Sequence, residues 1–141
     1  MKVSIYPAEK IKKLAWTAIF IVYAGIIFYA SIHPVQEGVP IITVPGADKL
    51  IHAGEFTLFT LIGYKAISYY TESDGRYRSL ITLSFFYGGL TELVQIFFHY
   101  RTASVLDWFA DIFGIGFGLI VILLIDGWRK NQDRNYTEPP S

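Results

Sequence analysis

The sequence predicts an all-α integral membrane protein, a bundle of four transmembrane helices with both termini in the cytoplasm. Four apolar blocks of about 20 residues each are long enough to cross a hydrocarbon core of about 30 Å. Charged residues make up only 17% of the chain, whereas average soluble domains contain about a quarter. The blocks leave no room for a separate soluble domain, so residues 1–141 are expected to form a single membrane domain.

The four predicted spans are residues 14–32, 48–70, 79–98 and 104–125. The first follows a basic start that could pass for a signal peptide. Its apolar stretch is too long for one, and no small-residue cleavage site follows, so we expect a retained helix. The connection after it holds Pro34, Pro40 and Pro45 around an apolar middle. We expect it either to fold back over the outer end of the bundle or to form an ordinary extended connector.

The later connections are short. The second is a polar turn, and the third is so short that the last two spans should pack as an antiparallel hairpin. In the last span, Gly114, Gly116 and Gly118 form a small-residue face with GxxxG spacing, which favours close helix packing over ligand contact. Residues 129–141 form a polar tail, and we expect its residues 131–141 to be disordered.

Lysine and arginine residues predict the orientation, because short cytoplasmic flanks are enriched in them. They lie before the first span, around the second connection and after the fourth span: Lys2, Lys10, Lys12, Lys13, Lys65, Arg76, Arg78, Arg129, Lys130 and Arg134. The first connection has none, and the third has only Arg101. Both termini are therefore expected to be cytoplasmic, with the first and third connections outside.

Polar side chains gather at the outer ends of the last three spans, and we call them the outer cluster. They are Asp48, Lys49, His52, Glu55, Glu92, Gln95, Arg101, Asp107 and Asp111. Charges inside lipid are costly and rare, so the outer cluster predicts a ligand-binding site on the extracytoplasmic side. Side chains three, four or seven residues apart share a helix face, so Asp48, His52 and Glu55 should point the same way. The three spans should thus aim their polar groups into one pocket.

The outer cluster has a formal charge of −3 when His52 is neutral, because it contains five carboxylates, Lys49 and Arg101. An uncompensated charge of that size is unstable in a low dielectric. The sequence therefore predicts compensation by water in the pocket, by protonated carboxylates, by a protonated His52 or by a bound cation.

Part of the outer cluster also has a purely structural interpretation. Asp48 follows a Pro-Gly-Ala stretch and is a candidate cap of the second helix. Ser104 and Asp107 have the spacing of a capping box at the start of the fourth helix. A structural ion-pair network with Lys49 and Arg101 is the main alternative to a binding site.

Three segments within residues 47–119 resemble the VanZ-like family of small membrane proteins. The family shares an Asp-Lys-x-x-His opening, then Glu-x-x-Gln, then an arginine followed by Ser-x-x-Asp and a glycine-rich helix. The matching residues are Asp48, Lys49, His52, Glu92, Gln95, Arg101, Ser104 and Asp107. Two positions depart from the pattern, since Phe56 stands where tyrosine is common and Asp111 where many members carry asparagine.

The founding member of that family is associated with low-level resistance to the glycopeptide teicoplanin. The resemblance implies a small cell-envelope protein whose outer pocket affects access to an extracytoplasmic lipid-linked target. An effect on teicoplanin susceptibility, a form of antibiotic resistance, is a candidate phenotype.

Two functions fit the outer cluster. In the first, it binds the polar head of an amphipathic or lipid-linked envelope ligand, and Lys49 and Arg101 hold a phosphate or carboxylate. In the second, a membrane enzyme acts on a lipid-linked substrate at the outer leaflet. There His52 is the acid or base, Glu55 or Glu92 tunes it, and Arg101 holds an anion, so the catalytic candidates are His52, Glu92 and Arg101.

A metal-assisted form of the enzyme is a further alternative. The candidate ligands are His52, Glu55, Glu92 and Asp111, an oxygen-rich set that suits Mg²⁺, Mn²⁺ or Ca²⁺ and also admits Zn²⁺. The chain has no cysteine, which excludes disulfides, thiolate metal sites and a cysteine nucleophile. A net charge of zero gives no sign of a nucleic-acid partner, so the bilayer is the partner that composition predicts.

Overall fold

The computed structural model describes residues 6–33, 46–98 and 105–137, and the regular secondary structure in these ranges is entirely helical. The four helices are α1 (Tyr6–Ile32), α2 (Ala47–Ile67), α3 (Ser73–Gln95) and α4 (Val105–Thr137). The all-α prediction is confirmed, and each predicted span falls largely on one helix. The first connection, Arg101 and Ser104 lie outside the described residues.

The predicted disorder of the polar tail is wrong over residues 131–137, because α4 continues to Thr137. The stretch from Arg129 to Thr137 contains no glycine or proline, and the first proline comes at Pro139. Polar residues such as lysine, arginine and glutamine are good helix formers, so loss of hydrophobicity alone does not end a helix.

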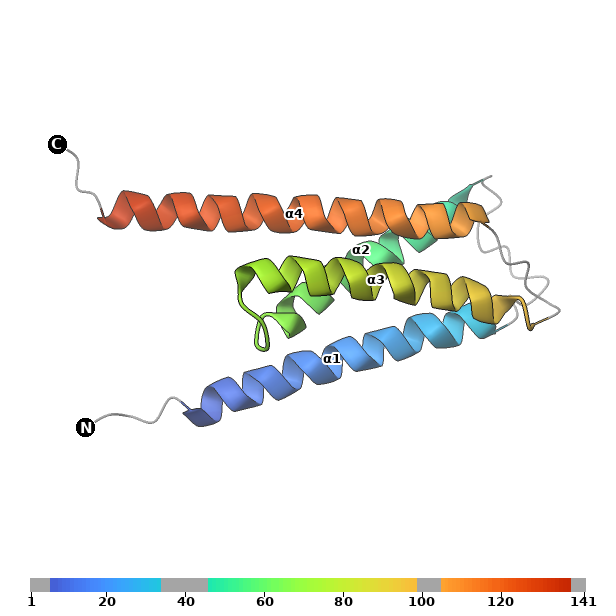
Figure 1. Ribbon diagram of the computed structural model, residues 1–141, viewed down its shortest axis with the longest axis horizontal. Coiled ribbons are helices and arrows are strands. Elements are labelled where there is room, and N and C mark those ends of the chain that lie inside the picture. Colours follow the sequence, from blue (N-terminus) through green and yellow to red (C-terminus); the bar gives the residue numbers. More distant parts are fainter. Residues whose placement is uncertain (1–5, 34–45, 99–104, 138–141) are drawn as a thin grey trace.

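Successive helices run in opposite directions (Figure 1). α1 begins and α4 ends at the left of that view, where α2 ends and α3 begins. We call this the termini end. The opposite end, where α1 and α3 end and α2 and α4 begin, we call the site end.

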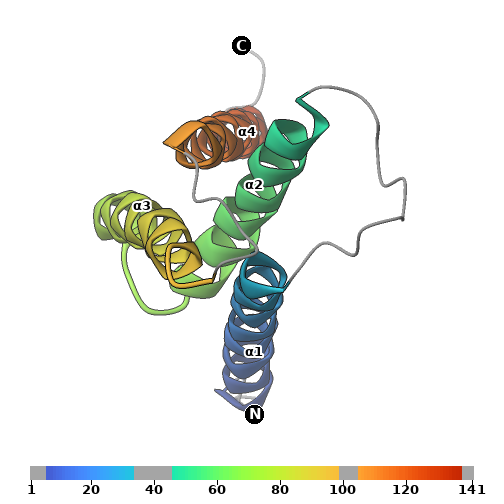
Figure 2. The same cartoon turned by 90° about the vertical axis from the view of Figure 1, so that its right-hand side faces the viewer.

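α2 is the central helix of the packing. It contacts the other three helices, whereas α1 contacts α2 and α3 but not α4. Figure 2 shows α1 and α4 on opposite sides of α2. The interior between them is apolar, with Ile27, Phe56, Phe59 and Ile115 buried together. The rings of Phe59 and Tyr87 stack there with their centroids 4.8 Å apart, which fixes α3 against α2.

Two glycines allow α4 to lie close to α2. A Cβ atom on Gly114 would collide with the carbonyl group of Ala53, and one on Gly118 would lie 2.8 Å from the Cβ atom of Thr60. A Cβ atom on Gly116 would meet nothing within 4 Å. The predicted packing role is therefore confirmed for Gly114 and Gly118, whose four-residue spacing puts them on one face.

We expect Gly114→Ala to lower the free energy of unfolding by about 1–3 kcal/mol, since the added methyl group forces α4 away from α2. Denaturation of the purified protein in detergent measures this. The matched control is Gly116→Ala, which adds the same methyl group on the same helix where there is space for it. That variant should be neutral or stabilised by up to about 1 kcal/mol through helix propensity. Equal effects at both positions would show that the close approach is unimportant.

Two of the helices are long and apolar enough to cross a membrane. They span Pro7–Ile32, with a mean hydropathy of 1.9, and Val105–Arg134, with a mean hydropathy of 2.4. Only 11% of the first apolar window and 33% of the second are buried inside the structure. The two helices therefore differ from a core helix of a soluble protein, which protein surrounds on all sides. α2 and α3 do not meet the same test of apolar length and charge.

Candidate functional site

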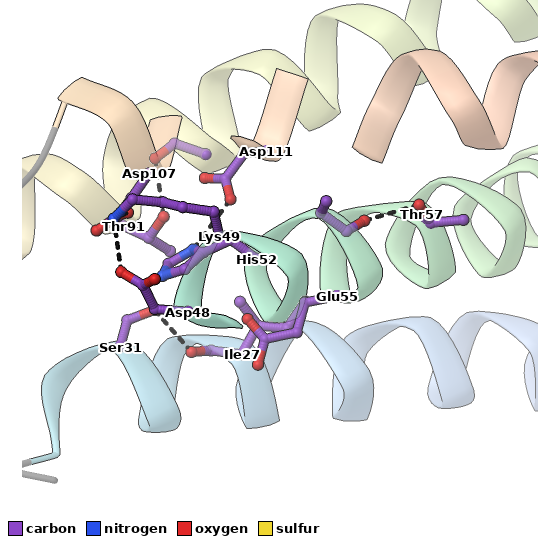
Figure 3. Close-up of polar contacts among 12 residues, drawn as sticks. Ile27, Ser31, Asp48, Lys49, His52, Glu55, Thr57, Thr91, Asp107 and Asp111 are labelled. Carbon is purple, nitrogen blue, oxygen red and sulfur yellow. Dashed lines mark hydrogen bonds and ion pairs between the residues drawn. The ribbon is translucent and has the colours of Figure 1, made fainter. Parts of the chain in front are cut away.

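The described residues of the outer cluster lie together at the site end. α2 contributes Asp48, Lys49 and His52, and α4 contributes Asp107 and Asp111 (Figure 3). Glu92 reaches the same region from α3, close to His52 and Asp111. Three helices thus supply polar groups to one place, as the helical spacing predicts.

Lys49 joins α2 to α4. Its ammonium donates to Asp48 Oδ2 at 2.6 Å and makes a second, shorter contact with Asp107 Oδ1. The side chain of Asp107 is only 14% exposed, whereas that of Asp48 is 61% exposed. The inner pair is therefore the stronger one, because exposed pairs are screened by water. An anionic ligand that used Lys49 would have to compete with both carboxylates.

The predicted capping role of Asp48 is wrong. The N-cap of α2 is Gly46, which adopts a left-handed conformation with φ 83°, and no side chain of the described residues makes a cap hydrogen bond there. Glycine takes that conformation without a steric penalty. Asp48 instead lies in the first turn of α2, where a negative charge interacts favourably with the helix dipole. The capping box of the fourth helix cannot be placed, because Ser104 lies outside the described residues.

His52 and Asp111 form a pair across the α2–α4 interface. The imidazole Nδ1 lies 3.1 Å from Asp111 Oδ1, and the Asp111 side chain is only 1% exposed. Nδ1 carries the hydrogen that bonds to the carboxylate. Nε2 is then the ring nitrogen that is available to a ligand. The buried carboxylate thus fixes both the orientation of His52 and the atom that it presents.

The second carboxylate oxygen of Asp111, Oδ2, is buried and has no hydrogen-bond partner among the described residues. Gly88 on α3 makes room for it, since a Cβ atom there would lie 3.2 Å from Oδ2 and 3.3 Å from the ring of Phe56. A buried carboxylate oxygen without a donor is costly. Asp111 Oδ2 therefore indicates that a donor or a cation belongs beside it.

Ligand atoms of His52, Glu92 and Asp111 lie within 4.8 Å of one another. We call these three residues the triad. Glu55, the fourth predicted metal ligand, is not part of it, because its side chain points from α2 toward α1 (Figure 3). The reason is helix geometry: three residues turn the helix by about 300° and advance it by about 4.5 Å, so Glu55 is deeper than His52 and rotated from it.

Two further residues at the site end have buried polar side chains. Gln95 is buried at the end of α3, with 2% of its surface exposed. Trp108 was not among the residues of the predicted outer cluster, yet its indole Nε1 is buried and has no hydrogen-bond partner in the described ranges. Its position one turn before Asp111 was the signal in the sequence, since residues three apart share a helix face.

The triad can serve two kinds of chemistry. A histidine oriented by a buried carboxylate suits proton transfer. The same imidazole with two carboxylates is also a set of ligands for a divalent cation. These residues fit such an ion because Asp111 Oδ2 has no hydrogen-bond donor beside it among the described residues.

Comparisons of the chain with protein-family models, with curated proteins and with solved structures find no match.

Proposed function

We propose that this is a VanZ-like, four-span protein of the cell membrane that binds the polar head of an amphipathic or lipid-linked envelope ligand at its site end. The site end then faces outward, and both termini are cytoplasmic. The distribution of basic residues supports this orientation, since in the described ranges every lysine and arginine except Lys49 belongs to the termini half of its helix. The antiparallel order of the helices is what four successive crossings require.

The single observation that carries the proposal is the convergence of the triad around the buried carboxylate of Asp111. Its Oδ2 atom is an acceptor without a partner among the described residues. The indole N–H of Trp108, one turn earlier on α4, is a buried donor that also has no partner there. A head group rich in hydroxyl or amino groups suits such a site, because charged acceptors make the stronger hydrogen bonds. Lys49 is occupied by its two carboxylates. Arg101, which lies outside the described residues, is the remaining cation that the sequence offers for the phosphate of a lipid-linked ligand.

Lipids that co-purify with the protein test this function. We expect native mass spectrometry in mild detergent to find a lipid-linked envelope compound on the wild type. Asp111→Asn and Glu92→Gln should reduce its retention about tenfold or more, since a hydrogen bond to a charged group contributes about 1.5–3 kcal/mol. Lys130→Gln is the control, because Lys130 is exposed on α4 near the termini end.

The same variants give a cellular readout. If the resemblance extends to function, cells that make the wild-type protein should tolerate more teicoplanin than cells that make Asp111→Asn at equal abundance. Equal lipid retention by all variants would contradict the binding function. In that case the outer cluster is a structural network.

A metal-assisted membrane enzyme is the second candidate, and the 4.8 Å spacing of the triad favours it. In that function His52, Glu92 and Asp111 hold a divalent cation, which would supply charge stabilisation to a lipid-linked substrate at the outer leaflet. Divalent-cation binding therefore separates the two candidates.

A further inference from the structure

A cleft of about 410 Å³ opens at the termini end, away from the triad. It lies where α1 and α4 are not in contact, and all four helices contribute to its lining. Its charged lining residues are Lys65, Arg76, Arg129 and Asp126. Nothing in the proposed function uses this cleft, which we call the basic cleft.

The basic cleft has a surplus of two positive charges, since three of its charged side chains are cationic and one is a carboxylate. The carboxylate of Asp126 is already occupied, because it accepts hydrogen bonds from the hydroxyl groups of Tyr64 and, at 2.8 Å, Tyr77. Burial and the hydrogen bonds with Tyr64 and Asp126 raise the pKa of Tyr77 above its usual value, so its hydroxyl stays protonated as a donor.

The three cations, Lys65, Arg76 and Arg129, have no ion-pair partner in the part of the chain that the structure describes. Arg76 is held in place by its Nη1 atom, which donates to Tyr64 Oη at 3.1 Å, and by the ring of the same tyrosine at 5.1 Å. Its Nε atom is buried and has no hydrogen-bond partner in those ranges. A guanidinium that is fixed but incompletely bonded is well suited to a phosphate.

Apart from Tyr64 and Ser68, the remainder of the basic cleft is apolar. Trp16 lines it from α1, Leu61 from α2, and Ile122 and Ile125 from α4. An anionic ligand with a hydrocarbon chain would therefore satisfy both parts of the lining, whereas a free inorganic anion would leave the apolar part in contact with water. Membrane leaflets on the cytoplasmic side are rich in anionic lipids, and basic clefts between helices on that side bind their head groups.

We propose that the basic cleft binds one anionic phospholipid, with its phosphate on Arg76 and Arg129 and an acyl chain along Trp16 and Ile125. Lys65 contributes further positive charge at the rim. This site is distinct from the triad in place, in ligand and in charge. It rests on the proposed orientation, which puts the termini end in the cytoplasm, but not on what the triad binds.

Native mass spectrometry of the full-length protein in nanodiscs tests this inference, with phosphatidylglycerol in phosphatidylcholine as the probe. The test variant is Lys65→Gln with Arg129→Gln, two exposed cations of the cleft that anchor nothing else in the described structure by a salt bridge. We expect retention of one phosphatidylglycerol molecule to fall about thirtyfold, since each basic residue near an anionic head group contributes about fivefold.

The matched control is Lys12→Gln with Lys130→Gln, which removes the same charge from exposed positions that do not line the cleft. It should keep retention within about twofold, because neither side chain lines the cleft and exposed charges are screened by water and salt. Equal losses in the two double variants, or equal retention of phosphatidylcholine, would overturn the proposal. Displacement of the bound lipid by excess inorganic phosphate would also overturn it, because the cleft would then be a site for a free anion.

Discussion

Replacing His52 with alanine is expected to destabilise the protein by about 3–5 kcal/mol. The Asp111 side chain is only 1% exposed, and it would lose the imidazole that lies 3.1 Å away. Removing one partner of a buried pair leaves a charge without compensation, which costs more than the intact pair contributes. Equilibrium unfolding in detergent measures the loss.

The control for this prediction is the double variant His52→Leu with Asp111→Leu. Replacing a buried ion pair by apolar side chains is often neutral, so the double variant should recover most of the stability that His52→Ala loses. The double variant should nevertheless fail to bind an envelope ligand, because it lacks both polar side chains. Recovery of both stability and ligand retention would mean that the pair serves only the fold. Full stability of His52→Ala would show instead that Asp111 is not held as an anion by His52.

The residues of the outer cluster could be recognised from the sequence because the chemistry of single residues carries through to the folded state. A charge in an apolar helix is costly wherever the helix packs, so Asp111, Glu92 and His52 stood out without knowledge of their partners. The glycine face of α4 was predictable for a similar reason, since small residues with four-residue spacing favour close helix contact. Both features depend only on local sequence.

The partners of these residues could not be predicted in the same way. Whether Lys49 meets Asp107, and whether Glu55 faces His52 or α1, depends on the rotation of each helix about its axis. A rotation of one residue position, about 100°, exchanges one set of neighbours for another. The basic cleft could not be predicted for the same reason. The positions of Lys65, Arg76 and Arg129 in the sequence predict the orientation in the membrane, but only the packing of the four helices brings these residues to one cleft.

Addition of Mn²⁺ is expected to stabilise the wild-type protein by about 2.7 kcal/mol at a free concentration of 100 times Kd, if the triad holds a divalent cation. The stabilisation follows from mass action, since the unfolded chain does not bring His52, Glu92 and Asp111 together. Asp111→Asn and Glu92→Gln should abolish it, because each removes an anionic ligand from a site with three protein donors. Thermal unfolding with and without a chelator measures the shift.

Glu55→Gln provides the matched control, because it removes a carboxylate of the same helix that points toward α1 rather than into the triad (Figure 3). The Mn²⁺ shift should survive in this variant, whatever its own stability. Loss of the shift in Glu55→Gln alone would mean that the cation sits deeper, between α1 and α2. Absence of any shift in the wild type would rule out the metal-assisted enzyme. The unpaired Asp111 oxygen would then require a hydrogen-bond donor from the ligand, and a head group with hydroxyl or amino groups supplies one.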